Sequence, residues 1–247
     1  MSTSLKDLAE AIRKAKHLTV FTGAGVSTLS GLRDFRGENG LYREFDADNI
    51  FDSLYFSYDP SFYYRHTKDF IYSSTQKDAS IVHVVLARLE RLGYVKTLIT
   101  QNIDLLHQKA GSKHVIEIHG SPRLHHCLSC GREKVFSKIV PVVRRGEVPV
   151  CEECGGVYKP DITFFGEALP AAALQEAVSE SRASDLMLVL GSTLLVQPAA
   201  SLPRHVLQGG GRIAIVNRGH TPLDAYADFR FDDLEAVFSY LENELVS

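Results

Sequence analysis

Hydrophobic residues gather along the chain in five short runs, and these runs predict the buried strands of a parallel sheet. Each run is almost continuously apolar, as expected for a strand covered on both faces, and each ends in small or polar residues. The predicted strands span residues 17–23, 96–102, 115–120, 185–191 and 212–217. Segments with apolar residues along one helical stripe alternate with them and predict helices at residues 4–16, 80–92, 170–182, 199–208 and 233–245.

The ends of these helices carry their own signals. Ser4 precedes the first helix and Asp7 follows three residues later, which is the spacing of a capping box. Gly93 stands where the second helix should stop. Strands and helices that alternate in this way predict an α/β fold with a doubly wound parallel sheet. In such a fold, ligands bind beyond the carboxyl ends of the strands.

Two stretches interrupt the alternation. Residues 36–79 are rich in Phe, Tyr and Asp and contain no clear strand, so we expect a helical module there. Residues 121–160 contain all four cysteines and several prolines. We interpret both stretches as insertions that together form a smaller lobe, which leaves an α/β core of about residues 5–35, 80–120 and 161–247.

Composition excludes several classes of protein. The 247 residues are 45% hydrophobic and 23% charged, which is typical of a globular chain. The net charge of −3 disfavours a nucleic-acid partner, because phosphate binding needs clustered Lys and Arg. No apolar run approaches the length of a membrane span, and the N-terminus is charged without an apolar signal core. We therefore expect a soluble, cytoplasmic protein without a membrane partner.

The four cysteines form two CxxC pairs, Cys127/Cys130 and Cys151/Cys154, with twenty residues between them. Disulfides are disfavoured in a chain without an export signal, and the spacing matches four thiolates around one Zn²⁺. Because four cysteines leave no open coordination position, we expect a structural ion whose binding contributes to folding. Three glycines supply the backbone freedom of the tight turns: Gly131, Gly155 and Gly156.

Most of the ten histidines have plain explanations. His125 and His126 lie beside Cys127 and are alternative metal ligands, but four thiolates already satisfy zinc. We therefore expect both rings to be solvated. His107 is expected to pack or hydrogen-bond so that it holds the loop at residues 102–104.

The first predicted strand runs into a glycine-rich turn, GAGVST at residues 23–28. Glycines let the backbone approach a pyrophosphate there, and amides at the start of the next helix can receive its charge. The turn departs from the dehydrogenase fingerprint G-x-G-x-x-G, because Thr28 stands at the third glycine. Glu44 and Asp46 lie in the insertion instead of at a strand end. Hydride transfer is therefore disfavoured, although a dinucleotide is not.

The other predicted strands also end in polar residues. TQNID at 100–104, HG at 119–120, GST at 191–193 and VNR at 216–218 stand at these ends. A buried apolar strand needs no polar cluster at its carboxyl end, so this arrangement indicates a polar ligand that spans the crevice. Without the rest of the TQNID motif around them, Asn102 and Asp104 would be interpreted as caps of the following helix.

Six motifs in order now identify a family. GAGVSTLSGLRDFRG, TQNIDLLHQKAG, the His-Gly pair, the paired CxxC motifs, ITFFGE, and the GST and VNR strand ends resemble the sirtuins, NAD-dependent protein lysine deacylases. The resemblance covers residues 5 to about 240. It implies a single catalytic domain with a Rossmann-like doubly wound sheet, in which a zinc-ribbon module and a helical module form the smaller lobe.

The resemblance also implies a role for individual residues. His119 is the catalytic base, and NAD and one structural Zn²⁺ are the cofactors. Thr163, Phe164 and Phe165 pair with an acetyl-lysine protein or peptide as an added strand. The residues implied to bind NAD are Ala24, Gly25, Thr28, Phe35, Arg36, Gln101, Asn102, Ile103, Asp104, Gly191, Ser192, Thr193, Asn217 and Arg218.

The implied reaction transfers the acetyl group from lysine to ADP-ribose and releases nicotinamide and O-acetyl-ADP-ribose. His119 deprotonates a ribose hydroxyl, a task that suits an imidazole with an ordinary pKa near 6.5. Two alternatives are mono-ADP-ribosyl transfer with the same cofactor and a preference for longer neutral acyl groups. A non-catalytic zinc-ribbon binding module is disfavoured by His119 and the near-neutral charge.

The chain departs from the family pattern at two places. Arg33 stands where the family usually has Pro, which leaves NAD affinity open. The helical module contains Tyr64-Arg65-His66-Thr67, without the Arg of the Tyr-x-x-Arg pair found in sirtuins that remove acidic acyl groups. We therefore expect deacetylation over desuccinylation. The aromatic cluster at residues 51–64 is expected to be lobe core in preference to an acyl pocket.

Overall fold

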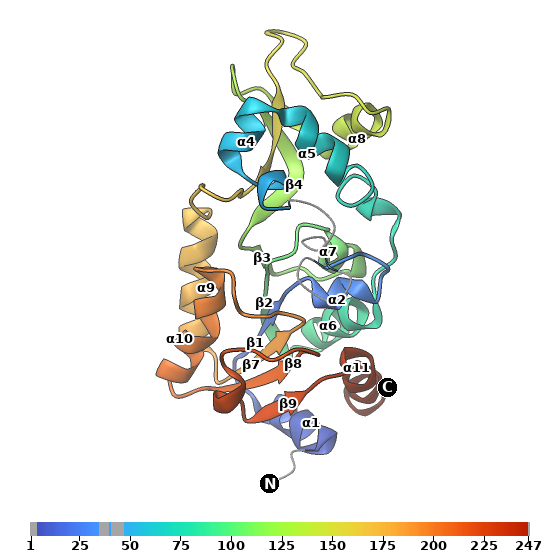
Figure 1. The fold of residues 1–247 in the computed structure, drawn as a ribbon. Helices are drawn as coiled ribbons and strands as arrows, with labels where there is room; N and C mark the ends of the chain where they lie inside the picture. The colour runs from blue at the N-terminus through green and yellow to red at the C-terminus, as the bar shows by residue number, and fades with distance from the viewer. Residues whose placement is uncertain (1–3, 35–39, 41–46, 247) are drawn as a thin grey trace.

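A six-stranded parallel sheet forms the larger lobe (Figure 1). The computed structural model describes residues 4–34, 40 and 47–246. The strands of this sheet are β1 (Leu18–Thr22), β2 (Val95–Thr100), β3 (Val115–Glu117), β7 (Leu186–Leu190), β8 (Arg212–Val216) and β9 (Phe229–Phe231). Their order is β3-β2-β1-β7-β8-β9. The chain winds outward in both directions from the β1–β7 pair, so the sheet is Rossmann-like and doubly wound, as predicted.

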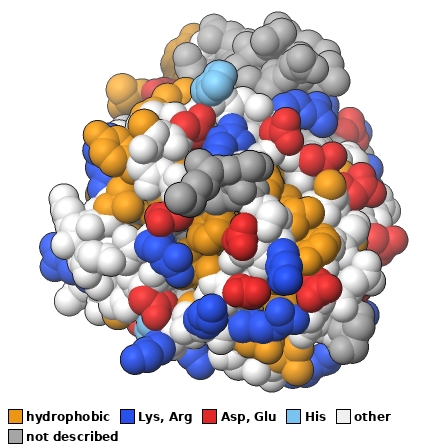
Figure 2. Space-filling view, turned by 90° about the horizontal axis from the view of Figure 1, so that it is seen from below, with side chains coloured by type: hydrophobic (Ala, Val, Ile, Leu, Met, Phe, Trp, Pro, Cys, Tyr) orange, Lys and Arg blue, Asp and Glu red, His pale blue; other side chains and the backbone are white. Residues whose placement is uncertain are grey.

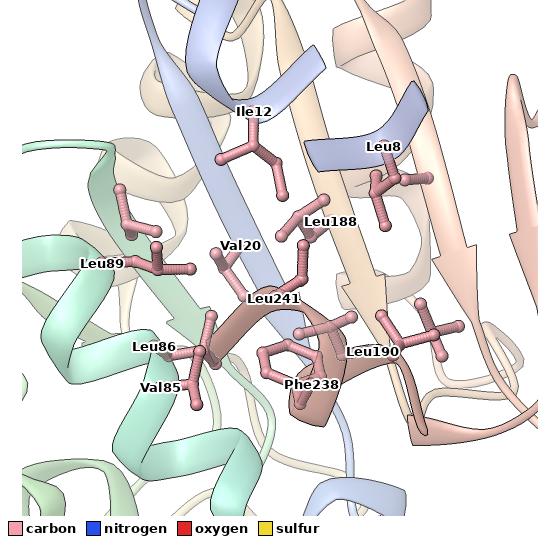
Figure 3. Close-up of a cluster of buried hydrophobic side chains, with 14 of the residues drawn as sticks. Leu8, Ile12, Val20, Val85, Leu86, Leu89, Leu188, Leu190, Phe238 and Leu241 are labelled. Carbon is pink, nitrogen blue, oxygen red and sulfur yellow. The ribbon is translucent and has the colours of Figure 1, made fainter. Parts of the chain in front are cut away.

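Helices cover both faces of the sheet (Figure 1). On one face lie α1 (Leu5–Lys14), α6 (Ile81–Arg91) and α11 (Leu234–Leu245), and on the other lie α9 (Ala171–Ala183) and α10 (Leu202–Gln208). Successive strand residues serve opposite faces: Val20 packs with the first group of helices and Phe21 with the second. Figure 3 shows the first cluster, where side chains from α1, β1, α6, β7 and α11 point toward one another.

Local signals set the helix boundaries. Ser4 accepts from the backbone N–H of Asp7 and the Asp7 carboxylate accepts from that of Ser4, so the predicted capping box is present. Gly93 follows α6 with φ +82°. The short elements of this lobe are α2 (Gly25–Thr28), α7 (Leu106–Ala110) and two 3₁₀ turns, η3 (Ala199–Ser201) and η4 (Asp224–Tyr226). The predicted helix at residues 199–208 therefore divides into η3 and α10.

The smaller lobe joins the two inserted stretches through one core. An antiparallel sheet contains β4 (Gly120–Cys127), β5 (Glu133–Val135) and β6 (Tyr158–Ile162) in the order β5-β4-β6, beside α8 (Phe136–Arg144). Residues 47–76 supply α3 (Ala47–Ile50), α4 (Ser53–Tyr58), α5 (Pro60–Thr67) and η2 (Ser74–Gln76). Aromatic rings fill the interface: Phe164 lies edge-on to Phe51 and Phe56, with ring centres 5.8 and 5.4 Å away. The cluster at residues 51–64 is thus largely lobe core, as expected.

The cysteine-bearing stretch enters and leaves the smaller lobe at two adjacent points. β4 begins at Gly120, directly after His119, and Gly120 pairs with Ile162 at the end of β6. The amide of Thr163 then donates to the His119 carbonyl oxygen at 2.9 Å. A Cβ atom at residue 120 would lie 2.1 Å from the Asp161 carbonyl oxygen, so only glycine fits this crossing. His119 is therefore held at the junction of the lobes.

The face seen from below shows basic and acidic side chains interspersed (Figure 2), in keeping with the small net charge. Among the described residues, no helix combines the length and the apolar character that crossing a bilayer requires.

Candidate functional site

A large cavity lies at the carboxyl ends of the parallel strands, beneath the smaller lobe. Its volume is about 1390 Å³, which exceeds the usual size of a site for one drug-sized molecule. The cavity spans the point where the strand order reverses, between β1 and β7. Fifteen described residues that the sequence predicted for cofactor, catalysis or substrate line it: Ala24, Gly25, Thr28, Gln101, Asn102, Ile103, His119, Thr163, Phe164, Phe165, Gly191, Ser192, Thr193, Asn217 and Arg218.

One described residue predicted to bind NAD does not line the cavity, and two others cannot be placed. Phe35 and Arg36 lie outside the described residues. Asp104 lies just behind the wall, where its carboxylate accepts from Ser27 Oγ at 2.6 Å and from the Leu106 amide at 2.9 Å. Burial raises the pKa of Asp104, and the hydrogen bond from Ser27 offsets part of that effect. Asp104 thus caps α7 and also fixes the glycine-rich turn.

The glycine-rich turn is pressed against the end of β7. The Gly25 amide donates to the Gly191 carbonyl at 2.9 Å, and a Cβ atom on Gly25 would lie 2.6 Å from Gly191 Cα. Because neither backbone has room for a side chain, amides and carbonyls form this part of the cavity wall. A phosphate-bearing ligand can approach such a wall closely.

The polar strand ends are connected to one another. Gln101 Nε2 donates to Ser192 Oγ at 2.8 Å, which joins the end of β2 to the end of β7. Asn102 Nδ2 donates to the Gly23 carbonyl at 3.1 Å and lies 3.2 Å from Ser27 Oγ. These bonds hold the amide side chains in fixed orientations before any ligand is bound.

A buried hydroxyl chain supports Asn102 from behind. The backbone N–H of Asn102 donates to Thr100 Oγ1 at 3.0 Å. The Thr22 hydroxyl also donates to Thr100 Oγ1, and Thr22 Oγ1 lies 3.0 Å from His107 Nε2. Burial holds the pKa of His107 well below its ordinary value, so the ring is neutral. As predicted, His107 hydrogen-bonds, although it supports the loop through two threonines instead of directly.

His119 is poised as a neutral base. Its Nδ1 lies 3.0 Å from the Gln101 carbonyl oxygen, which can only accept a hydrogen bond. Nδ1 therefore carries the proton, and Nε2 keeps its lone pair. Burial lowers the pKa of His119, and the Gln101 bond partly opposes that shift. A half-buried neutral imidazole at a cavity wall is suited to remove a proton from a hydroxyl.

The segment predicted to pair with a peptide is largely bonded within the chain. The amides of Thr163, Phe164 and Phe165 donate to His119 O, Glu167 Oε2 and Phe51 O respectively. The Phe165 carbonyl also accepts from Ser53. These three residues line the cavity, but their N–H groups are not available to an added strand. The sequence pattern could not reveal this, because the partners come from distant segments.

The four cysteines come together at the tip of the smaller lobe. Their sulfur atoms all lie within 4.8 Å of one another, with Cys127–Cys154 at 3.4 Å and Cys130–Cys151 at 3.7 Å. A tetrahedral zinc with Zn–S bonds of about 2.3 Å requires sulfurs about 3.8 Å apart. The backbone amide of Glu153 lowers the pKa of Cys151 to about 6, which favours the thiolate that a metal binds. The donor set fits structural zinc.

One expectation about the neighbouring histidines is wrong. His125 is 0% exposed, and its Nε2 lies 2.9 Å from the Tyr72 hydroxyl inside the lobe core. Burial lowers the pKa of His125 to about 3. His126 is partly exposed and lies 2.5 Å from Asp161 and 3.2 Å from Glu133, which raises its pKa. Neither ring belongs to the sulfur cluster.

Several features in or beside the cavity had no sequence signal. Leu105 and Leu194 adopt positive φ, +65° and +56°, a conformation that costs a branched side chain energy and often occurs beside functional residues. Leu105 follows Asp104, and Leu194 follows Thr193. Residues 232–235 at the start of α11 also line the cavity. Ser27 hydrogen-bonds to both Asn102 and Asp104, but the sequence indicated it only as a member of the glycine-rich turn.

Comparisons with known proteins agree on one family. Residues 23–198 match the Sir2 family. The chain is 41% identical over 228 residues to an NAD-dependent protein deacetylase of Thermotoga maritima, covering 92% of each chain. It is 40% identical to NAD-dependent protein deacylase 2 of Archaeoglobus fulgidus, covering 93% of this chain and 91% of that one. A solved structure of Sir2 with a p53 peptide and NAD+ superposes with a TM-score of 0.91 at 38% identity, covering 99% and 100% of the two chains.

Proposed function

Because this chain belongs to the Sir2 family, we propose that it is an NAD-dependent protein lysine deacetylase of the acyltransferase class. It would transfer the acetyl group of acetyl-lysine to ADP-ribose and release nicotinamide, O-acetyl-ADP-ribose and the free lysine. The observation that carries the proposal is the state of His119, a neutral base with its Nδ1 proton fixed, in a cavity that also contains the glycine-rich turn and the Phe164 segment.

The cavity wall fits NAD. The backbone of residues 23–25 lacks side chains that would block a pyrophosphate, and Arg218 lines the same cavity with a positive charge. Gln101, Asn102 and Ser192 are pre-oriented by the bonds between them and toward Gly23, so they can bind polar groups of the cofactor with little ordering cost. When bound, NAD supplies an electrophilic ribose carbon and a nicotinamide leaving group.

The remaining groups would hold the acyl-lysine and exclude water. Ile103, Phe51 and Phe164 line the cavity with apolar surface and are mostly buried, which suits the aliphatic stem of a lysine. His119 Nε2 would take a proton from a ribose hydroxyl, while the Gln101 carbonyl stabilises the resulting imidazolium through Nδ1. Exclusion of water would keep the activated sugar from hydrolysis.

Two refinements belong to the same proposal. Tyr64 is buried and donates to the Tyr158 carbonyl, and Thr67 occupies the position where an acidic acyl group would need an arginine. We therefore favour acetyl, with longer neutral acyl groups as the alternative, over succinyl. The four-cysteine cluster would hold one structural Zn²⁺, and reduced thiols of this kind suit the cytoplasm.

Product analysis tests the reaction. The purified chain is incubated with an acetyl-lysine peptide and NAD labelled in its ADP-ribose half. Deacetylation places the label in free O-acetyl-ADP-ribose, whereas mono-ADP-ribosyl transfer, the runner-up, attaches it to protein. Mass spectrometry distinguishes the two, and recovery of the label on protein alone would replace the proposal with the runner-up.

His119→Ala tests the base. We expect NAD-dependent deacetylation to fall by about 10²–10⁴-fold, the usual contribution of a general base. The circular dichroism spectrum and melting temperature should stay near those of the wild type, because the ring is half-buried and has one described hydrogen bond. Turnover within a few-fold of wild type would refute the role of His119.

A further inference from the structure

One mostly buried cation in the smaller lobe has no role in the chemistry above. Lys159, in β6, has a side chain that is only 14% exposed, although lysine is rarely buried without charged partners. Its Nζ lies 3.0 Å from Glu167 Oε2 and 4.1 Å from the centre of the Phe164 ring. The partners of Lys159 therefore belong to the segment that lines the cavity.

The same ammonium group covers the outer edge of β6. Nζ donates to the Ile162 carbonyl at 3.0 Å and to the Pro160 carbonyl at 3.4 Å. β6 pairs with β4 on its inner side and is the edge strand of the described three-stranded sheet. A peptide strand that paired with this edge would need those carbonyls, and Pro160 has no N–H to offer in exchange. Lys159 thus occupies two acceptors that strand addition along β6 would use.

Glu167 closes the segment that follows. Its Oε2 also accepts from the Phe164 amide at 2.8 Å, and its own amide donates to the Phe164 carbonyl at 3.0 Å. Residues 164–167 therefore form a closed turn whose carboxylate is fixed by Lys159. Removal of the ammonium group would leave this carboxylate held by the Phe164 amide alone and would expose the carbonyls of β6 at the same time.

We propose that Lys159 is a positioning residue for the protein substrate. By covering the β6 edge and anchoring Glu167, it directs an added peptide strand to the chain beyond Phe165 and so places the acyl-lysine against His119. This inference rests on the proposed function, because it concerns the peptide of that same site. It predicts that loss of Lys159 weakens binding of the residues that flank the acyl-lysine. Turnover of an acyl-lysine without flanking residues should not change.

Lys159→Met tests this, because methionine fills similar space without a charge or donor. For an acetyl-lysine peptide with several flanking residues, we expect kcat/KM to fall about tenfold, mainly through KM, the size of effect expected when charged hydrogen bonds are lost. KM for NAD and kcat/KM for an Nε-acetyl-lysine derivative without flanking residues should change by less than about twofold. Lys159→Arg should restore the peptide KM, since guanidinium can donate to the same oxygens. Lys138→Met, an exposed lysine in α8, is the matched control.

Direct binding separates this inference from the proposed function. Fluorescence anisotropy of a labelled acetyl-lysine peptide should show about tenfold weaker binding to Lys159→Met than to wild type or Lys138→Met. Binding equal to wild type, or an equal loss of kcat/KM on the peptide and on the single acetyl-lysine derivative, would overturn the inference and leave the deacetylase proposal intact. If the wild-type chain shows no deacetylation, and the peptide still binds more weakly to Lys159→Met than to wild type, the inference stands and the deacetylase proposal falls.

Discussion

At the scale of single residues, one hydrogen bond determines how His119 can act. The Gln101 carbonyl holds the Nδ1 proton, so the lone pair of the neutral ring is on Nε2. Gln101 also bonds to Ser192 through its side chain, and its backbone therefore lies at a fixed point between the ends of β2 and β7. The tautomer of His119 is thus set by a backbone carbonyl at the end of β2 and not by a carboxylate.

The pH dependence of the reaction should reflect the environment of His119. Burial lowers the pKa of His119, so the ring stays neutral and basic at pH values where an ordinary histidine is half protonated. We expect the acidic limb of kcat/KM for an acetyl-peptide to lie below about pH 6.5. His126→Gln should leave the limb in place, because His126 is outside the cavity and its pKa is raised. A limb above that pH in the wild type would contradict the assignment.

The histidines also show what sequence reasoning can find at this scale. A motif separates His119 from the other nine, and the structure brings it to the cavity. The expectation that His125 is solvated was wrong because it rested only on the four thiolates leaving the ring no place as a metal ligand. Alternation along β4 contained the missing signal: residues 125 and 127 share one face of the strand, and that face packs into the lobe core.

At the scale of elements, long apolar strands and helices were predictable, and short polar ones were not. The five predicted strands match β1, β2, β3, β7 and β8 within a few residues. β5 and β9 have three residues each, and charged residues interrupt both, so no apolar run emerges; β3 is as short but lies in the predicted run at residues 115–120. β4 and β6 are stabilised by pairing with each other and by the aromatic core, contacts that arise only when distant segments meet.

The zinc module gives a prediction at the same scale. We expect about one zinc per chain, and we expect Cys130→Ser to lose the metal, because three thiolates and a hydroxyl bind zinc less well. Zinc binding contributes on the order of 10 kcal/mol in small zinc modules, so the variant should melt at a markedly lower temperature and lose peptide binding. Ser129→Ala, a neighbouring exposed position, is the control. A metal-free preparation with full activity and unchanged stability would contradict this role.

At the scale of the whole molecule, the two lobes are joined through the site. His119 and Thr163 are bonded across the junction, and Ile103 of the larger lobe packs with the core of the smaller one. Sequence reasoning predicted two insertions and a site at the strand ends. It could not give the internal pairing of residues 163–165, which depends on how the helical module docks against β6.

Stability of the whole molecule should depend on pH through a buried histidine. Burial lowers the pKa of His83 to about 4. Below about pH 6.5, His83 is therefore protonated in the unfolded chain while it stays neutral in the folded chain. The free energy of unfolding therefore falls as pH decreases from about 6.5 to about 4, and His83 should account for about 1.3 kcal/mol of loss between about pH 7.5 and 5.5.

Urea unfolding at both pH values measures this loss. His83→Asn keeps an acceptor for the Ser80 amide without a titrating group, so its stability should fall less steeply than that of the wild type by that amount. Equal slopes would contradict the assignment. His114 and His126 have raised pKa values and act in the opposite direction, but they contribute equally to both proteins.

The covered edge of β6 has a consequence for a crowded solution of this protein. An uncovered edge strand invites the edge of another molecule, and such pairing is a common start of aggregation. Pro160 removes a donor from that edge, and Lys159 covers two of its acceptors. Two copies of the chain would therefore find few free backbone groups along β6 with which to pair their small sheets. Lys159, which we propose directs the substrate strand to the residues beyond Phe165, thus also hinders pairing with the β6 edge of a second copy.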